Sequence, residues 1–266
     1  MSSARAVIEI DNVHKVYGSG DSEVRALDGI SLSIAEGDFV TIQGSSGSGK
    51  STLMNILGCL DVPTHGAYRL DGIDVSTLSE NQLADLRNSR IGFIFQSFNL
   101  LRRTSAIRNV EVPLAYARVP RKERRARSAE ALRSVGLGDR LDHQPSQLSG
   151  GQMQRVAVAR ALVTNPAMVL ADEPTGNLDS KSTADVIHLL EELNSRGRTI
   201  VWITHEDEVA RHAKRRIWLV DGRIASDERA VGVDDYPPLY RPSAATQHQA
   251  SSTQHQLHAQ HQMAVL

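Results

Sequence analysis

A segment rich in glycine and serine has the residue types that bind a phosphate group. It begins directly after the apolar run Phe39 to Gln43 and opens a helix-compatible stretch from Ser51 to Leu60. Its glycines let successive backbone N–H groups face one anion, which the positive end of a following helix also attracts. Lys50 would reach the β- and γ-phosphates of a nucleotide, and the Ser51 hydroxyl would bind Mg²⁺. The predicted phosphate loop consists of Gly44, Ser45, Ser46, Gly47, Ser48, Gly49, Lys50 and Ser51.

Two adjacent carboxylates end a second apolar run. Asp172 and Glu173 follow Met168 to Ala171, and neighbouring parallel strands can place this end beside the phosphate loop. Asp172 would then bind Mg²⁺, directly or through water, and Glu173 would act as the general base that polarises an attacking water. The alternative is an acidic turn after a strand. It loses weight beside a phosphate loop, because hydrolysis of a Mg-nucleotide needs such a pair of groups.

A second glycine motif predicts a second anion site. Ser149 is a suitable N-cap for the helical run Met153 to Val163, and two glycines let backbone amides approach a ligand closely. Two phosphate-type sites about a hundred residues apart indicate that each nucleotide is held between two molecules. The residues of this site are Ser149, Gly150, Gly151 and Gln152.

The elements that would position these groups indicate an α/β fold. Strand-like alternation occurs near the amino terminus, and later apolar runs are short and separated by helical sequence, as in a buried parallel sheet. The first group includes Ala6 to Val13, Leu32 to Ile34 and Ala67 to Asp71; the second includes Phe39 to Gln43, Ile91 to Gln96, Met168 to Ala171 and Thr199 to Ile203. We expect a mainly parallel core sheet with an antiparallel β subdomain.

Between Ser97 and Pro166 strand signals vanish, so residues 97–166 are predicted to form an inserted helical subdomain. Its basic run could touch anionic lipid, but a solvated helix face that also carries Glu123 and Glu130 is the simpler interpretation, which we favour. The basic run consists of Arg121, Lys122, Arg124, Arg125 and Arg127.

Composition sets limits on partners and compartment. The formal charge of -1 argues against nucleic acid as a partner. The single Cys59, among apolar residues, is expected to be a buried thiol. Met1 to Lys15 lacks the apolar core of a signal peptide, and no apolar run is long enough to span a membrane. We therefore expect a cytosolic chain unless another protein holds it at a membrane.

The carboxyl-terminal part is expected to lack a packed core. Asp221-Gly222 would form the turn of a hairpin from Ile217 to Ala225. Tyr236 to Leu266 is rich in Pro, Ser, Gln and His and too poor in apolar residues to offset the entropy cost of packing. We predict one domain over residues 6–228 and a disordered tail over 229–266.

Together these motifs resemble the nucleotide-binding subunits of ATP-binding-cassette (ABC) transporters, from about Val7 to Glu228. The matching strings, in order, are Gly44 to Thr52, Gln96, Leu148 to Gln152, Ala171 to Thr175, Asn177-Leu178-Asp179 and Thr204-His205. The resemblance implies a phosphate-loop NTPase cassette, with ATP and Mg²⁺ as cofactors and two copies that close as a homodimer around two MgATP. It places Thr52 and Asp179 among the nucleotide-binding residues.

The resemblance also assigns roles that spacing alone does not. Gln96 would sense Mg²⁺ and the attacking water, and His205 would contact the γ-phosphate and help to hold Glu173. Tyr17 falls where such subunits stack an aromatic ring on adenine, although a strand-end tyrosine is the alternative. The chain has Gly176 where many members have Ser, and Glu206 where the family often has Asp. Neither change removes a phosphate or metal ligand.

Within the family, the strings after Gln96 and Pro174 resemble the macrolide-exporter and lipoprotein-release branch. That resemblance makes Phe98 to Leu101 the expected docking segment for an integral membrane permease, although an apolar turn would have a similar sequence. The implied function is an ATPase subunit, cytoplasmic and peripheral on the inner face of the cell membrane. It would power a separately encoded permease that exports or extracts a hydrophobic or lipid-linked substrate. An ATPase that regulates cell-wall enzymes through a membrane partner during division is the alternative.

Overall fold

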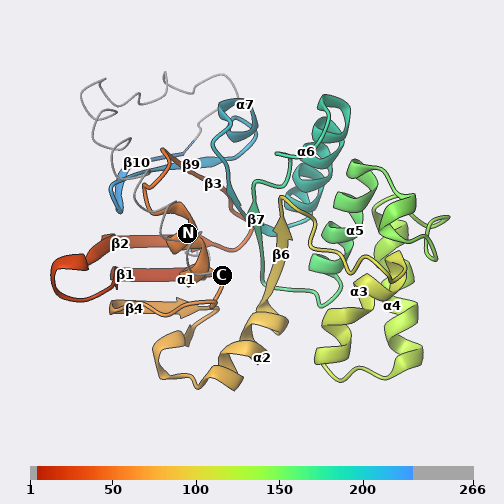
Figure 1. Ribbon diagram of the computed structural model, residues 1–266, viewed down its shortest axis with the longest axis horizontal. Helices are drawn as coiled ribbons and strands as arrows, with labels where there is room; N and C mark the ends of the chain where they lie inside the picture. Colours follow the sequence, from red (N-terminus) through yellow and green to blue (C-terminus); the bar gives the residue numbers. More distant parts are fainter. Residues whose placement is uncertain (1–4, 230–266) are drawn as a thin grey trace.

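The computed structural model describes residues 5–229, which form two β-sheets and a group of helices at one side (Figure 1). Strand β10 ends at Arg229, so the predicted tail starts one residue too early. The rest of that predicted tail lies outside the described residues. The predicted α/β class, with a mainly parallel core sheet and an antiparallel β subdomain, is confirmed.

The larger sheet has the strand order β10-β9-β3-β8-β7-β6. Its five strands from β9 to β6 are parallel, and β10 pairs antiparallel with β9 at one edge. The strand bounds are β3 Phe39–Gly44, β6 Ile91–Phe95, β7 Met168–Asp172, β8 Thr199–Ile203, β9 Arg215–Val220 and β10 Arg223–Arg229. Because consecutive parallel strands end at the same edge, the segments after β3, β7 and β8 come together there.

Both faces of this sheet are buried at β7 and β8, which explains why these two strands have nearly continuous apolar sequences. Val201 and Ile203 of β8 join the core shared with the smaller sheet, whereas Ile200 and Trp202 join the core shared with the helices. Adjacent side chains on a strand point to opposite faces, so both kinds of position must be apolar. Helix α1 (Lys50–Leu57) belongs to the first core and α6 (Ser180–Ser195) to the second.

The smaller sheet is antiparallel and has the order β2-β1-β4-β5. Its strands are β1 Ala6–Tyr17, β2 Val24–Ala35, β4 His65–Leu70 and β5 Ile73–Asp74. Three 3₁₀ helices occur in the described chain: η1 Gly20–Ser22, η2 Val75–Thr77 and η3 Pro145–Gln147. Cys59 is buried in the core between the two sheets, as expected.

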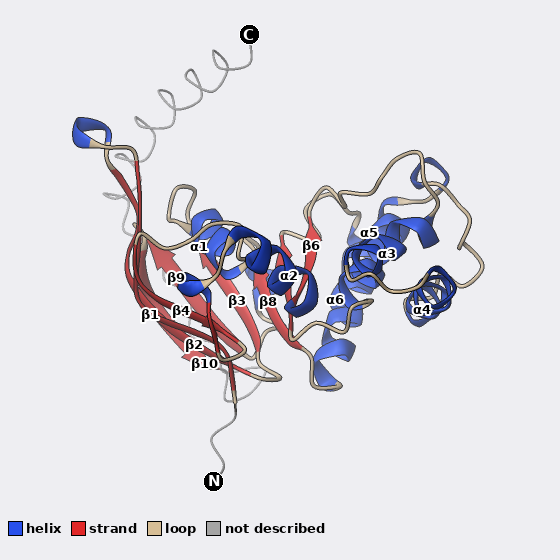
Figure 2. Cartoon of the chain, turned by 90° about the horizontal axis from the view of Figure 1, so that it is seen from below, coloured by secondary structure: helices blue, strands red, loops and turns tan. Residues whose placement is uncertain are grey.

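The described residues 97–166 contain helices and turns but no strand. Helices α3 (Ala106–Tyr116), α4 (Arg121–Ser134) and α5 (Gly150–Leu162) pack together beside the sheet, and α2 (Glu80–Arg90) precedes β6 (Figure 2). The short α7 (Asp207–Ala210) follows β8. Across residues 5–229, none of the helices combines the length and the apolar character needed to traverse a bilayer.

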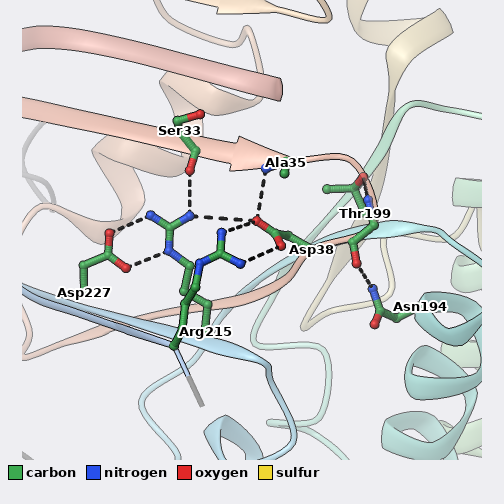
Figure 3. A network of polar contacts seen from close by, with 9 residues as sticks. Ser33, Ala35, Asp38, Asn194, Thr199, Arg215 and Asp227 are labelled. Carbon is green, nitrogen blue, oxygen red and sulfur yellow. Dashed lines mark hydrogen bonds and ion pairs between the residues drawn. The ribbon is translucent and has the colours of Figure 1, made fainter. Parts of the chain in front are cut away.

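A buried arginine joins the two sheets at the edge opposite the phosphate loop (Figure 3). Arg215, at the start of β9, donates through Nε and Nη2 to the two carboxylate oxygens of Asp227, each at 2.6 Å. Its Nη1 donates to the Ser33 carbonyl of β2 at 2.6 Å and lies 3.9 Å from Asp38. The bidentate pair satisfies a charge that is only 9% exposed, so the ion pair and the carbonyl contact hold β2, β9 and β10 together.

We expect Arg215→Ala to lower the free energy of unfolding by about 2 to 3 kcal/mol, because it leaves Asp227 and the Ser33 carbonyl without their shared donor. Arg223→Gln is the matched control. Arg223 also pairs with an aspartate, Asp28, but is 70% exposed, so its loss should cost at most about 1 kcal/mol. Urea unfolding of the two variants measures both values. Equal losses would contradict the role assigned to Arg215.

Candidate functional site

The predicted phosphate loop connects β3 to α1, and its backbone has a shape that only glycine permits. Gly44 and Gly49 have φ values of 154° and 99°. A Cβ at Gly44 would lie 2.4 Å from the Leu219 carbonyl oxygen, and one at Gly49 would lie 2.5 Å from that of Ala26. Both positions therefore need glycine for conformation and for space. The loop is held tightly on its protein side, which leaves its other side for a ligand.

Lys50 begins α1 and turns its ammonium group back over this loop. Its Nζ donates to the carbonyl oxygens of Gly44 and Ser45, both at 2.7 Å. Partial burial lowers the pKa of Lys50, and the nearby Glu173 and Asp172 oppose that shift. The Ser48 hydroxyl is buried and has no hydrogen-bond partner within the described chain. A partly desolvated cation and an unsatisfied donor beside a glycine loop fit a phosphate ligand.

The two carboxylates lie at the end of β7 on the same sheet edge. Burial and the neighbouring Glu173 raise the pKa of Asp172, and Lys50 partly offsets this effect. Glu173 adopts a left-handed backbone with φ of 42°, and its N–H donates to the Ile203 carbonyl of β8 at 2.9 Å. For a residue other than glycine this conformation is strained, so the backbone bond to β8 fixes where Glu173 lies.

His205, just after β8, contacts Glu173 directly. Its Nδ1 lies 2.7 Å from Glu173 Oε1, and the imidazole is well exposed. The structure therefore brings Lys50, Asp172, Glu173 and His205 to one edge, from three neighbouring strands in the order β3-β8-β7. This arrangement can hold a phosphate, place a carboxylate near a water molecule and orient that carboxylate through the histidine.

Gln96, directly after β6, contacts a different part of the site. The Gln96 side-chain Nε2 donates to Asn177 Oδ1 at 3.5 Å, and the Gln96 backbone carbonyl accepts from Asn177 Nδ2 at 3.2 Å. A Cβ at Gly176 would lie 2.7 Å from Gln96 Nε2, so glycine at 176 lets this side chain lie against the loop. Within residues 5–229, no hydrogen bond joins Gln96 to Asp172 or Ser51. Its predicted role as a sensor of metal and water stays a prediction.

The second glycine motif lies at the start of α5, as predicted, and Ser149 caps that helix. The Gln152 N–H donates to Ser149 Oγ at 3.3 Å, and Gln152 Oε1 accepts from the Ser149 N–H at 2.9 Å, which forms a capping box. This box explains why α5 begins at Gly150 rather than at the predicted Met153. Strands β6 and β7 separate α5 from α1 (Figure 1), so one chain does not bring its two anion motifs together.

Asp179 caps α6, where its carboxylate accepts from the N–H and the hydroxyl of Ser182 at 3.0 and 2.8 Å. These bonds lower the pKa of Asp179. A Cβ at Gly151 would lie 2.6 Å from Ser182 Oγ, so this cap is packed against the second glycine motif of the same chain. Asp179 therefore has a structural role as the cap of α6, and its direct contact with a nucleotide stays a prediction.

Tyr17 ends β1 with its ring 40% exposed. Its hydroxyl donates to Asp61 at 2.9 Å, and the Lys15 ammonium lies 5.0 Å from the ring centroid. Burial and Asp61 raise the pKa of Tyr17, whereas a hydrogen bond with Thr52 lowers it. The Thr52 contact places Tyr17 beside the first turn of α1. An exposed ring held at this position is suited to stacking on a base next to the phosphate loop.

Two residues of α5 that sequence reasoning missed connect the predicted site segments. The buried Gln154 donates to the Pro174 carbonyl at 2.6 Å and to the Phe95 carbonyl at 3.4 Å. Arg160 donates to the carbonyl oxygens of Phe98 and Asn99 at 2.9 and 2.5 Å. The sequence showed only polar positions in a helix. Their backbone partners lie about 20 and 60 residues away in sequence, so no local pattern marks them.

Mg²⁺ would have few protein ligands here. Nowhere between residues 5 and 229 do three His, Cys, Asp or Glu side chains form a metal cluster. The predicted ligands Ser51 and Asp172 lie at the first turn of α1 and the end of β7. This oxygen pair fits a Mg²⁺ ion that takes its other ligands from phosphate and water.

Asp172 gives a prediction that separates stability from function. The pKa of Asp172 is raised in the folded chain. Its contribution to the free energy of unfolding is therefore fully favourable below the ordinary pKa of an aspartate and is lost as pH rises through the raised value. Without nucleotide, Asp172→Asn should therefore raise the melting temperature at pH 7 by roughly 1 to 2 °C, since partial exposure limits the effect. It should also reduce Mg-dependent nucleotide hydrolysis by at least about 100-fold. Calorimetry and a phosphate-release assay test both; a lower melting temperature at pH 7 would contradict the electrostatic account.

The chain is similar to known proteins of one transporter family. Residues 27–176 match the family model described as ABC transporter. The chain is 51% identical over 223 residues to an uncharacterized ABC transporter ATP-binding protein of Bacillus subtilis, which covers 84% of this chain and 97% of that protein. It is 58% identical over 236 residues to the macrolide export ATP-binding/permease protein MacB of Hyphomonas neptunium. That match covers 88% of this chain but only 37% of MacB.

A solved structure gives the same result. A dimeric ATP-binding cassette in a post-hydrolysis state with ADP and Pi superposes with a TM-score of 0.77 at 45% identity, covering 85% of this chain and 99% of that one. The family match, the full-length relative and the shared fold agree with the order of motifs along the sequence. The chain belongs to the ABC transporter family.

Proposed function

We propose that this chain is the ATP-binding and ATP-hydrolysing subunit of a transporter and that it powers a separate membrane permease. The observation that carries the proposal is the convergence of Lys50, Asp172, Glu173 and His205 at one sheet edge, beside a glycine loop. Each group has the chemistry that hydrolysis of a Mg-nucleotide needs. The family match and the ADP and Pi in a 45% identical cassette support the same activity.

Bound MgATP would supply the γ-phosphoryl group and a divalent charge that stabilises the transition state. The loop amides and Lys50 would hold the phosphates, and Ser51 and Asp172 would hold the metal. Glu173 would accept a proton from the attacking water at a carboxylate oxygen. His205 would keep that carboxylate in place through the contact at 2.7 Å, and Tyr17 would stack on the adenine.

We further propose that two copies complete each site. Within one chain, the motif from Ser149 to Gln152 lies on the far side of β6 and β7 from the phosphate loop (Figure 1). This motif at the start of α5 would have to bind an anion from outside its own chain. The nucleotide held by a second copy, related by two-fold symmetry, can be that anion. The dimeric form of the 45% identical cassette supports this arrangement. Loss of the bridging γ-phosphate would then open the dimer.

A groove between the sheet and the helices is proposed as the docking surface for the permease. It measures about 690 Å³ and is lined by the stacked rings of Phe93 and Phe95 and by Asn99 of the predicted docking segment. Tyr116 and Leu101 stand at 75% and 53% exposure near it. Arg160 holds the backbone of Phe98 and Asn99, so a permease segment that pressed on them would act directly on α5. Exposed aromatic and apolar side chains of this kind favour a protein partner.

The substrate and location follow from the relatives and remain part of the proposal. We propose that the permease is a separate chain and that this subunit lies peripherally on the inner face of the cell membrane; the Bacillus subtilis relative, named an ABC transporter ATP-binding protein, supports the first point. The Hyphomonas relative is named a macrolide export protein. Export or extraction of a hydrophobic or lipid-linked substrate agrees with that relative's name. Control of cell-wall enzymes is not proposed further, because the reported relatives give it no support.

Glu173→Gln tests the proposed chemistry. The amide keeps the size of the side chain but cannot accept a proton, so ATP hydrolysis should fall by about 100-fold or more. Lys50, Ser51 and Asp172 remain, so ATP should stay bound and the variant should accumulate as a dimer with MgATP but not with MgADP. Phosphate release and size-exclusion chromatography measure the two effects.

Glu208→Gln serves as the control for this experiment, because Glu208 is an exposed carboxylate on α7 and, in the part of the chain that the structure describes, forms no hydrogen bond or ion pair with Lys50 or His205. It should hydrolyse ATP like the wild type and form no trapped dimer. A Glu173→Gln variant that stays monomeric and hydrolyses at the wild-type rate would disprove the assignment of Glu173.

A further inference from the structure

The helical region carries a strong positive charge that the proposed ATPase site does not use. Residues 97–166 contain 13 Arg and Lys against 5 Asp and Glu, a formal charge of +8 in a chain whose total is -1. The whole-chain value hides this asymmetry. Such a separation of charge indicates a surface that meets an anionic partner.

Four of these cations line one shallow pocket along α4. Arg121, Lys122, Arg125 and Arg133 surround a space of about 610 Å³ with Ile107 and Leu141 among its apolar lining, and no carboxylate lines it. Long basic side chains with apolar stems over an apolar base suit a charged headgroup attached to a hydrocarbon chain.

The simpler interpretation, a solvated helix face balanced by acids, explains only part of this pocket. Arg133 pairs with Glu130 at 3.1 Å, and Arg125 lies 3.6 Å from Asp142, where both side chains are exposed. The side chains of Arg121 and Lys122 make no ion pair or hydrogen bond within residues 5–229. They also stand in the first turn of α4, where the helix dipole disfavours cations, so their charge does not stabilise the helix.

The segment that lines the groove proposed for the permease leads along the chain into α4. Tyr116 ends α3 and lines that groove, and residues 117–120 lead directly to Arg121. Helix α2 and this connection lie along the lower edge in Figure 1, and Figure 2 views the molecule from that side. A permease seated in the groove would orient this edge toward the bilayer in which it is embedded. This step rests on the proposed function.

We propose that the pocket along α4 binds the anionic phospholipid headgroups of the membrane around the permease. The charge is complementary to an anionic leaflet, and each Lys or Arg near such a surface adds to the attraction. The contact would hold the helical region at the bilayer, and the negative charge that balances this region lies elsewhere in the sequence.

The test uses the full chain and vesicles, without a permease. Co-sedimentation is measured with phosphatidylcholine vesicles and with mixed phosphatidylglycerol–phosphatidylcholine vesicles, at one slightly alkaline pH throughout. Arg121→Gln/Lys122→Gln is compared with Arg211→Gln/Lys214→Gln, which removes the same charge from exposed positions outside the helical region. The first variant should bind anionic vesicles about 30-fold more weakly, equivalent to about 2 kcal/mol, whereas the control should bind like the wild type.

Three outcomes would overturn the proposal: no preference for anionic vesicles, an equal loss in the two variants, or binding that added salt does not weaken. Tighter binding of duplex DNA than of vesicles at equal phosphate concentration would also overturn it, in favour of nucleic acid. MgATP hydrolysis by the same samples is measured in parallel and should be unchanged in both variants. A wild type that hydrolyses MgATP normally but does not bind anionic vesicles would reject the lipid contact alone, whereas a wild type without hydrolysis would reject the proposed function.

Discussion

The site depends on three charged groups, those of Lys50, Asp172 and Glu173, that share a partly buried space. Burial makes the ionised forms of Lys50 and Asp172 less favourable. Glu173, Asp172 and two backbone carbonyls compensate the Lys50 charge, and Lys50 partly compensates that of Asp172. Such an arrangement costs folding free energy unless a ligand takes over the compensation. The parallel sheet makes it possible, because β3, β8 and β7 end at one edge with Lys50, His205 and the carboxylates after them. A charged phosphate and a divalent cation would satisfy all these groups at once, which explains why the site is built from groups that do not stabilise the fold.

The sequence predicted the parts of the structure that local patterns determine. Thr199 to Ile203 matches β8, and the run from Met168 differs from β7 by one residue, since strands buried on both faces are apolar throughout. The hairpin was predicted to begin at Ile217, but β9 begins at Arg215. From the sequence alone, Arg215 would be taken for a solvent-exposed residue, because its partner Asp227 cannot be identified there. The bond between them also keeps β10 paired as far as Arg229. The strand order and the contacts of Gln154 and Arg160 depend on partners distant in sequence, so no local pattern reveals them.

The contacts of α5 explain how a change at one end of the helical region could reach the other. Ser149 caps the amino end of α5 at the second glycine motif, and Arg160 near its other end holds the backbone of Phe98 and Asn99. Gln154, between them, donates to the carbonyl of Phe95 at the end of β6 and to that of Pro174, which follows Glu173. One rigid helix thus connects the proposed docking segment, the carboxylate loop and the motif that would meet a second copy. In that arrangement a permease and a bound nucleotide would act on the same element.

The shared site between two copies is the central claim, and a mixing experiment tests it most directly. Gly150 has room for a side chain in its own chain, where a Cβ would lie 3.4 Å from Leu178 at the closest, so Gly150→Asp should fold but repel phosphate. Lys50→Ala and Gly150→Asp should each be inactive alone, because every site in either dimer has one defective half. In an equal mixture, a mixed dimer has one site built from two intact halves, so phosphate release should recover to about a quarter of the wild-type rate. A mixture that stays as inactive as its components, although mixed dimers form, would contradict the account.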